Sequence, residues 1–279
     1  MDADTGVMNK LDHPEVLRVL FHPRQDTHTA PPSANLSEEL VTVADGVAIS
    51  GRFHVTENAR ATILFFHGNG ETSGDYDQVA QFYLEKKINF LAVDYRGYGK
   101  SGGAPTASSL LRDAHVLLKY VTSWMEQRSI TGPLVVMGRS LGAAPAIECA
   151  ASYRDQVKGL IIESGFADSL PVLRTLGVDL AAVGLAETEG FGNAAKIRAV
   201  TAPTLILHGQ YDRIVSLENG EGLQRESGAK IKQFFIIPGA DHNSMLQMGG
   251  ATYFETISRF IDKVVGGPVR RKRQNRREP

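Results

Sequence analysis

The chain alternates unbroken apolar runs with amphipathic stretches along most of its length. The runs are "ATILFF", "INFLAV", "PLVVM", "GLIIE", "TLIL" and "KQFFII", each followed by a glycine, a proline or a polar residue. Such runs are typical of short strands buried on both faces of a sheet. Stretches between them have helical spacing, most clearly "SSLLRDAHVLLKYVTSWMEQ", where apolar residues recur every three or four positions. This alternation predicts an α/β fold with a mostly parallel sheet and helices on both faces.

Two earlier strands follow a different pattern. "EELVTVADG" and "VAISGRFHV" meet at Asp45-Gly46, a dipeptide that is favoured in tight hairpin turns. We therefore expect an antiparallel hairpin at one edge of the sheet, which brings the predicted number of strands to eight.

The polar and apolar pattern also predicts the domain organisation. Residues 1–37 are expected to be an extended N-terminal lead-in packed on the domain, and residues 38–266 a single α/β domain. Within that domain, residues 166–200 are less regular and are expected to contain a small helical lid. Residues 267–279 are predicted to be a basic, disordered tail.

Composition and charge limit the kinds of partner and metal site that the chain is expected to have. The chain of 279 residues is 42% hydrophobic and 22% charged, with a formal net charge of −1. The tail "VRRKRQNRREP" holds six basic residues and one acid, so its charge of +5 leaves −6 for the rest of the chain. That sign argues against nucleic-acid binding. With Cys149 as the single cysteine, neither a disulfide nor a cysteine-based metal site is expected. Neither a signal peptide nor a membrane span is indicated, so we expect a cytoplasmic protein.

The segment "GRSLG" carries the candidate chemistry. It fits the pattern Gly-x-Ser-x-Gly, which is weak alone but here lies between a predicted buried strand and a predicted helix. A strand-to-helix elbow exposes its serine in strained backbone geometry, where side chains two residues away would collide. Ser140 is therefore the candidate nucleophile, and Gly138 and Gly142 are the elbow glycines.

A serine nucleophile needs a base and an acid. His242 follows the last strand, and Asp212 follows the strand before it, so the chain order is nucleophile, acid, histidine. Glu163 is the rival acid, while Asp241 is too close to the histidine in sequence to orient it. Each of the histidines His67 and His208, which precede glycines at strand ends, is interpreted as structural.

The transition state of acyl transfer needs hydrogen-bond donors for its oxyanion. The backbone N–H of Leu141 is one candidate, and the loop "HGNGE" offers a second from Asn69. The same loop lacks the lysine and the spacing of a phosphate or dinucleotide site. Asp94 and Arg96, in "DYRGYGKSGG", are interpreted as structural.

Five ordered segments together resemble the α/β-hydrolase superfamily: "FFHGNGE", "DYRGYGKSGG", "GRSLGA", "LILHGQYDRIV" and "PGADHNSM". More narrowly, they look like its BEM46-like branch of small serine hydrolases, which is related to depalmitoylase-type proteins. The resemblance covers roughly residues 38–265. It implies the α/β-hydrolase fold, a triad of Ser140, Asp212 and His242, and oxyanion donors at Asn69 and Leu141.

These observations predict hydrolysis of carboxylic esters or thioesters with small to medium acyl groups, without metal or organic cofactor. The substrate pocket candidates are Gly70, Phe166, Leu170 and Leu173, and the lid either covers an acyl chain or simply packs on the core. An amide or peptide hydrolase with the same triad, or a non-catalytic binding protein on the same fold, are the alternatives. A serine at the elbow disfavours the dehalogenases and epoxide hydrolases, which use aspartate. The sequence leaves the oligomeric state open.

Overall fold

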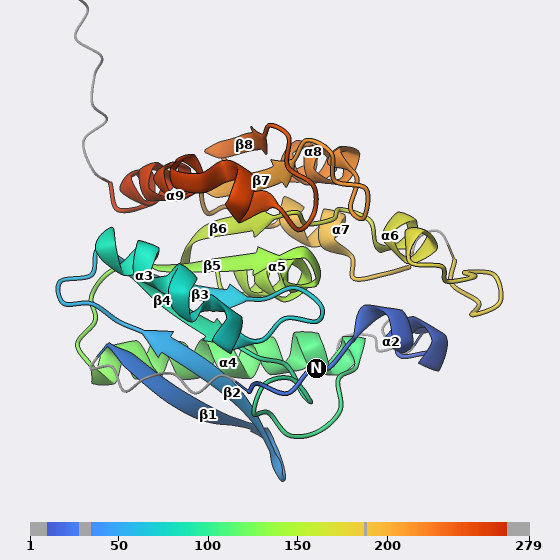
Figure 1. The fold of residues 1–279 in the computed structure, drawn as a ribbon, viewed down its shortest axis with the longest axis horizontal. Coiled ribbons are helices and arrows are strands. Elements are labelled where there is room, and N and C mark those ends of the chain that lie inside the picture. Colours follow the sequence, from blue (N-terminus) through green and yellow to red (C-terminus); the bar gives the residue numbers. More distant parts are fainter. Residues whose placement is uncertain (1–9, 28–34, 187–188, 267–279) are drawn as a thin grey trace, which may run out of the picture.

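The structure is a computed structural model that describes residues 10–27, 35–186 and 189–266. Within these ranges eight strands form one sheet in the order β1-β2-β4-β3-β5-β6-β7-β8 (Figure 1). The strands are β1 (Leu36–Ala44), β2 (Val47–His54), β3 (Ala61–Phe66), β4 (Ile88–Val93), β5 (Leu134–Arg139), β6 (Val157–Glu163), β7 (Thr204–Gly209) and β8 (Lys232–Ile237). Strand β2 pairs antiparallel with β1 and β4, and the pairs from β4 to β8 are parallel. The predicted mostly parallel sheet with an antiparallel edge hairpin is confirmed.

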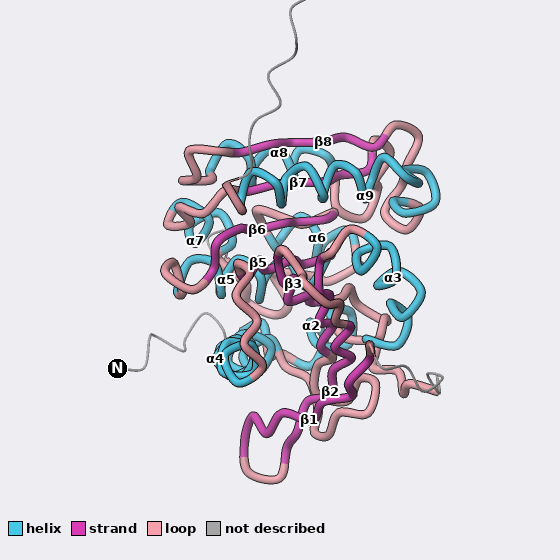
Figure 2. Tube along the Cα trace, turned by 90° about the vertical axis from the view of Figure 1, so that its left-hand side faces the viewer, coloured by secondary structure: helices cyan, strands magenta, loops and turns pink. Residues whose placement is uncertain are grey.

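Helices cover both faces of the sheet, as expected (Figure 2). One face carries α3 (Asp77–Glu85) and α9 (Met245–Val264), and the other carries α4 (Ala107–Gln127), α5 (Ala143–Ser152), α7 (Asn193–Arg198) and α8 (Leu217–Glu226). The short helices α2 (Pro14–Leu20) and α6 (Ser169–Thr175) contact each other beyond the carboxyl ends of the parallel strands (Figure 1). None of the described helices combines the length and the apolarity that crossing a bilayer requires.

Alternation along the strands explains why the apolar runs are unbroken. In β3, Ile63 and Phe65 face the core under α3 and α9, while Leu64 and Phe66 face the core under α4 and α5. Successive strand residues point to opposite faces, so a strand covered on both sides must be apolar at every position. The two cores hold the sheet rigid, and its carboxyl edge is where the candidate residues lie.

The N-terminal lead-in differs from the sequence prediction. Part of it, Pro14–Leu20, forms α2 instead of extended chain, with Pro14 in the first turn and His13 Nδ1 accepting the Glu15 N–H. Val16 and Leu20 of this helix are buried in the larger core. An isolated helix of seven residues is only marginally stable in water, so tertiary contacts stabilise α2. The predicted tail at 267–279 lies outside the described residues.

Candidate active site

The segment around Ser140 forms a tight elbow between β5 and α5. Ser140 has a φ of 52°, in the left-handed region that non-glycine residues seldom adopt. A Cβ added to Gly138 would lie 2.1 Å from the carbonyl oxygen of Gly142, and one added to Gly142 would lie 2.1 Å from that of Phe66. Both positions therefore require glycine, and the strain presents the Ser140 hydroxyl at the sheet edge.

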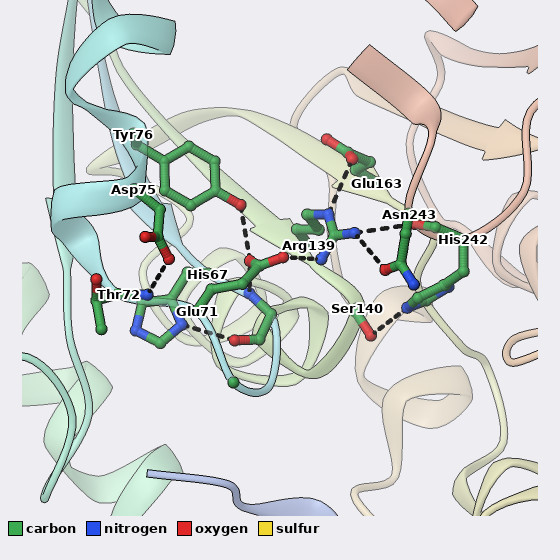
Figure 3. A network of polar contacts seen from close by, with 12 residues as sticks. His67, Glu71, Thr72, Asp75, Tyr76, Arg139, Ser140, Glu163, His242 and Asn243 are labelled. Carbon is green, nitrogen blue, oxygen red and sulfur yellow. Dashed lines mark hydrogen bonds and ion pairs between the residues drawn. The ribbon is translucent and has the colours of Figure 1, made fainter. Parts of the chain in front are cut away.

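The structure brings the three predicted triad residues together. Ser140 Oγ lies 2.9 Å from His242 Nε2 (Figure 3), and His242 Nδ1 lies 2.7 Å from Asp212 Oδ2. The other carboxylate oxygen, Asp212 Oδ1, accepts the backbone N–H groups of Ile214 at 3.0 Å and Val215 at 2.9 Å. An ionised carboxylate only accepts, so Nδ1 of His242 carries the proton and Nε2 accepts from the Ser140 hydroxyl. This arrangement can activate the serine.

The environment keeps Asp212 ionised. Burial by itself would raise the pKa of this carboxyl, but the hydrogen bond to His242, the electrostatic attraction of its ring and the Val215 N–H together outweigh it. The pKa of Asp212 is thereby held below its ordinary value. Asp212 and His242 are only 7% and 6% exposed, so their interaction is weakly screened by solvent.

The rival acids make other contacts. Glu163 accepts from Arg139 Nε at 3.2 Å and from the Tyr253 hydroxyl at 2.5 Å. Asp241 accepts the N–H groups of the two residues that follow His242 and the hydroxyl of Ser244. The ring nitrogens of His242 bond to Asp212 and Ser140 instead, so neither rival acid orients the ring.

The remaining histidines at strand ends have structural partners. His67 Nδ1 lies 2.7 Å from the carbonyl oxygen of Gly68, and His208 Nε2 lies 2.9 Å from that of Val215. Burial lowers the pKa of His208, which favours its neutral form. Both rings thus shape the loops that carry the candidate residues.

Asp94 and Arg96 stabilise the loop after β4. Asp94 is buried and accepts the Ser73 N–H at 2.7 Å and the Ser50 hydroxyl at 2.6 Å. Arg96 donates two bonds, at 2.6 and 2.7 Å, to the carboxylate of Asp113. These contacts agree with the structural role expected for both residues.

The candidate oxyanion donors lie beside Ser140. Leu141 follows the serine inside the short turn Ser140–Gly142 that leads into α5, where the first N–H groups of a helix have no acceptor in that helix. Asn69 and Leu141 line the same cavity as Ser140. The side chain of Asn69 donates to Val19 O at 3.2 Å and accepts the His22 N–H at 2.7 Å. Its side chain is therefore engaged with the carboxyl end of α2, and its backbone N–H is the group that can serve as the donor.

A cavity of about 250 Å³ opens at Ser140. Its walls come mainly from α2, α6 and neighbouring loops and are largely apolar, with Val19, Leu20, Leu141, Phe166, Val172, Leu173, Leu176, Phe191, Ile214 and Val215. Polar lining comes from His22, Asn69, Arg139, Ser140, Ser169, His242 and Asn243. Among the described lining residues there is neither an aspartate nor a glutamate. The cavity is suited to a neutral, mostly apolar group.

Two of the four pocket candidates line this cavity, namely Phe166 and Leu173. Leu170 does not: its side chain is 2% exposed and packs in the core. Gly70 does not either, and its carbonyl oxygen accepts from Arg24 Nε at 3.1 Å. The sequence did not predict that α2 forms a wall of the cavity, because nothing in the five-residue patch "VLRVL" indicates this role.

A metal centre is not formed in the part of the chain that the structure describes, where no cluster of three or more His, Cys, Asp or Glu side chains is arranged to hold an ion. The chemistry that the arrangement offers is a hydrogen-bonded serine, histidine and carboxylate, of which the serine and the histidine line a largely apolar cavity.

Comparisons with known proteins place this site in context. Residues 57–183 match a family described as "Serine aminopeptidase, S33". The protein bem46 of Schizosaccharomyces pombe is 32% identical over 209 residues, 73% of this chain and 68% of its own. Human alpha/beta hydrolase domain-containing protein 17B is 28% identical over 217 residues, 74% of this chain and 68% of its own.

Solved structures share the fold. The esterase Pf2001 of Pyrococcus furiosus superposes with a TM-score of 0.68 at 18% identity, covering 88% of this chain and 99% of its own. A soluble variant of monoglyceride lipase from Saccharomyces cerevisiae, in complex with a substrate analogue, gives 0.65 at 19% identity, covering 88% and 98%.

Proposed function

Because the chain belongs to the BEM46-like branch of the α/β-hydrolase superfamily, we propose that it is a serine hydrolase that cleaves carboxylic esters or thioesters. The observation that carries this proposal is the chain of hydrogen bonds from Ser140 through His242 to Asp212, beside an apolar cavity that Ser140 and His242 line. The hydrolase family and the esterase and lipase folds of its structural neighbours support the reaction class.

The reaction proceeds in two steps. Ser140 Oγ attacks the substrate carbonyl carbon while His242 Nε2 takes the hydroxyl proton, and Asp212 stabilises the imidazolium that forms. The N–H groups of Leu141 and Asn69 donate to the oxyanion of the tetrahedral intermediate. The intermediate collapses, and His242 returns the proton to the departing alcohol or thiol, leaving an acyl-enzyme. Water, activated by the same histidine, then releases the carboxylic acid and restores Ser140.

The cavity favours small to medium neutral acyl groups. Its volume of about 250 Å³ is modest, and its walls at Val19, Phe166 and Leu173 offer dispersion contacts and no charge. No step requires a cofactor. The cytoplasmic location and the small-molecule substrate stay predictions from the sequence.

Amide or peptide cleavage is the second candidate, since the matching family is described as a serine aminopeptidase. The same three residues can cleave amides. An aminopeptidase must also hold the charged amino terminus of its substrate, and a carboxylate is the natural partner for an ammonium group. The described cavity lining contains no carboxylate, which favours esters and thioesters.

Turnover measurements test the proposal. Wild-type protein is assayed with p-nitrophenyl butyrate, a butyryl thioester and an aminoacyl p-nitroanilide, beside Ser140→Ala and the control Ser123→Ala, at an exposed position of α4. We expect ester and thioester turnover in the wild type and in the control, and none above background in Ser140→Ala. Anilide turnover exceeding ester turnover favours the peptidase, and binding of these substrates without turnover favours a non-catalytic binding protein.

A further inference from the structure

Arg139, the variable residue of the elbow pattern, lies at the centre of a buried polar network behind Ser140 (Figure 3). Arg139 is 9% exposed, and although it borders the cavity, its guanidinium points toward Glu71 and Glu163. Because this residue is adjacent to the candidate nucleophile, its position is fixed by the same strand and turn.

The guanidinium contacts three neighbouring segments. Nη1 donates to the carboxylate of Glu71, and Nε donates to Glu163 Oε1 at 3.2 Å. Nη2 donates to the carbonyl oxygen of His242 at 2.9 Å and to Asn243 Oδ1 at 3.3 Å. One side chain thus joins the end of β5, the loop after β3, the end of β6 and the loop after β8.

Glu71 carries the connection into the candidate oxyanion loop. Its Oε2 accepts the Gly68 N–H and the Tyr76 hydroxyl, both at 2.7 Å. Gly68 immediately precedes Asn69, the residue whose N–H faces the oxyanion in the proposed mechanism. A Cβ at Gly68 would lie 2.6 Å from Arg139 Nη1, so the loop lies directly against the guanidinium.

The contact with the His242 carbonyl acts on the other side of the site. It fixes the backbone of the residue whose Nε2 lies 2.9 Å from Ser140 Oγ. A guanidinium has rigidly spread donors that reach several acceptors at once, whereas an ammonium is a compact point charge. The geometry of these contacts therefore needs arginine and not merely a positive charge.

We propose that Arg139 is a positioning residue: its guanidinium holds the loop of His242 and the loop of Asn69 in register around Ser140. This role rests on the proposed hydrolase function. Burial of an ion pair is a poor source of stability, because desolvation cancels most of the attraction. The network is better explained by orientation, because it holds two loops whose residues must meet at one reacting atom.

Electrostatics agrees with this geometry. Burial alone would raise the pKa of Glu71, but Arg139, His67, the Tyr76 hydroxyl and the Gly68 N–H together outweigh it and lower the pKa, so Glu71 is an anion that pairs with the guanidinium. Burial raises the pKa of Glu163 despite the opposing charge of Arg139. Glu71 is thus the charged anchor of the network.

Kinetics of Arg139→Lys provide the first test. Arg52→Lys is the matched control, because Arg52 is also a buried arginine that pairs with carboxylates, those of Asp26, Asp77 and Glu38. We expect kcat for p-nitrophenyl butyrate to fall about 100-fold in Arg139→Lys, with KM changed less than about twofold, since the loops act on the transition state. Arg52→Lys is expected to keep wild-type kcat. Unchanged kcat in a folded Arg139→Lys, or an equal loss in the control, overturns the proposal.

A second variant and a second readout keep the proposal separable from the proposed function. Glu71→Gln preserves the shape of the anchor and removes its charge, so it is expected to lower kcat by a smaller factor than Arg139→Lys does. If Arg139→Lys does not fold, unchanged kcat in Glu71→Gln overturns the proposal.

The proton resonance of His242 Nδ1–H reports ring position without any substrate. We expect it to shift or broaden in Arg139→Lys or Glu71→Gln and to stay in place in Arg52→Lys. Absence of turnover in the wild type contradicts the hydrolase function, and an unmoved resonance then also contradicts the role of Arg139.

Discussion

Nδ1 of His242 lies 2.7 Å from Oδ2 of Asp212, although the two residues follow different strands of the sheet. Strands β7 and β8 are parallel neighbours, so both residues emerge at the same edge. The contact fixes which nitrogen of His242 faces Ser140, and the proposed mechanism depends on that orientation.

Replacement of that carboxylate has a specific consequence. Asp212→Asn keeps the shape of the side chain but lets its amide donate to Nδ1, which favours the wrong tautomer of His242. We expect kcat for p-nitrophenyl butyrate to fall about 10⁴-fold, the size of effect known from this substitution in a serine protease triad. Asp241→Asn is the matched control at the neighbouring carboxylate and should lie within about threefold of the wild type. A larger loss in Asp241→Asn than in Asp212→Asn contradicts the assignment.

The sequence predicts the sheet well because its strands are buried on both faces. Runs such as "ATILFF" indicate strands that are buried on both faces. The need for glycine at the two elbow positions follows from backbone sterics alone. The chain order of Ser140, Asp212 and His242 sufficed to single out three residues that the fold brings into contact.

Other features lie beyond single-sequence reasoning. Helix α2 depends on contacts made by Asn69, which is about 50 residues away in the chain. Leu170 and Leu173 are equally apolar, and the orientation of a short helix decides which of them meets the cavity. The elbow pattern places no restriction on Arg139, so its partners become evident only from the structure.

That difference within α6 yields a test of the acyl pocket. Leu173 and Leu170 are 1% and 2% exposed, but only Leu173 lines the cavity. Leu173→Ala should raise kcat/KM for p-nitrophenyl octanoate relative to butyrate by about tenfold, because it adds room where the chain lies. Leu170→Ala should cost a similar amount of stability, about 3 kcal/mol, and leave the ratio unchanged. Equal shifts of the ratio in both variants would place the acyl group elsewhere.

Backbone strain at the elbow predicts an unusual order of stabilities. Ser140→Gly and Ser140→Ala both lose the hydrogen bond to His242, but only glycine adopts a φ of 52° without strain. We expect Ser140→Gly to be about 1 kcal/mol more stable than Ser140→Ala in urea denaturation. Ser123, at an exposed position inside α4, is the control, where glycine should be less stable than alanine by about 1 kcal/mol. The same order at both positions contradicts strain at Ser140.

The contact between Asn69 and α2 predicts a change in local stability. Asn69→Ala removes the bonds to Val19 O and to the His22 N–H. Hydrogen exchange of the amides of α2 should become faster, while exchange in α4 stays unchanged. Tyr98→Phe removes the hydroxyl that donates to the Asn69 oxygen and accepts the His22 N–H, but it leaves the bonds of Asn69 to Val19 O and to the His22 N–H, so it should have a smaller effect. Unaltered exchange of α2 in Asn69→Ala would show that the helix is held by its apolar side alone.

Acid stability depends on Glu148, which joins three helices through His115 at 3.2 Å and Lys196 at 2.7 Å. Burial would raise the pKa of Glu148, but these partners and Ser152 lower it from 4.5 to about 2. A carboxyl with a lower pKa in the folded chain favours folding above its ordinary pKa, and that contribution is lost as the pH falls toward 2.

Thermal unfolding across pH checks this expectation. Glu148→Gln should melt below the wild type at pH 7, and the difference should close as the pH falls from 4.5 to 2. Glu126→Gln, at an exposed position, is the control and should follow the wild type. A difference that stays constant with pH contradicts the ionic origin.

Ser140 is the nucleophile of the proposed reaction, and covalent labelling with a fluorophosphonate is the sharpest test of that role. The probe reacts with an activated serine, and mass spectrometry of the digested protein locates the adduct. We expect one adduct, on the peptide that contains Ser140; it should be absent in Ser140→Ala and form much more slowly in Asp212→Asn. An adduct on another serine, or equal labelling of Ser140→Ala, would contradict that role.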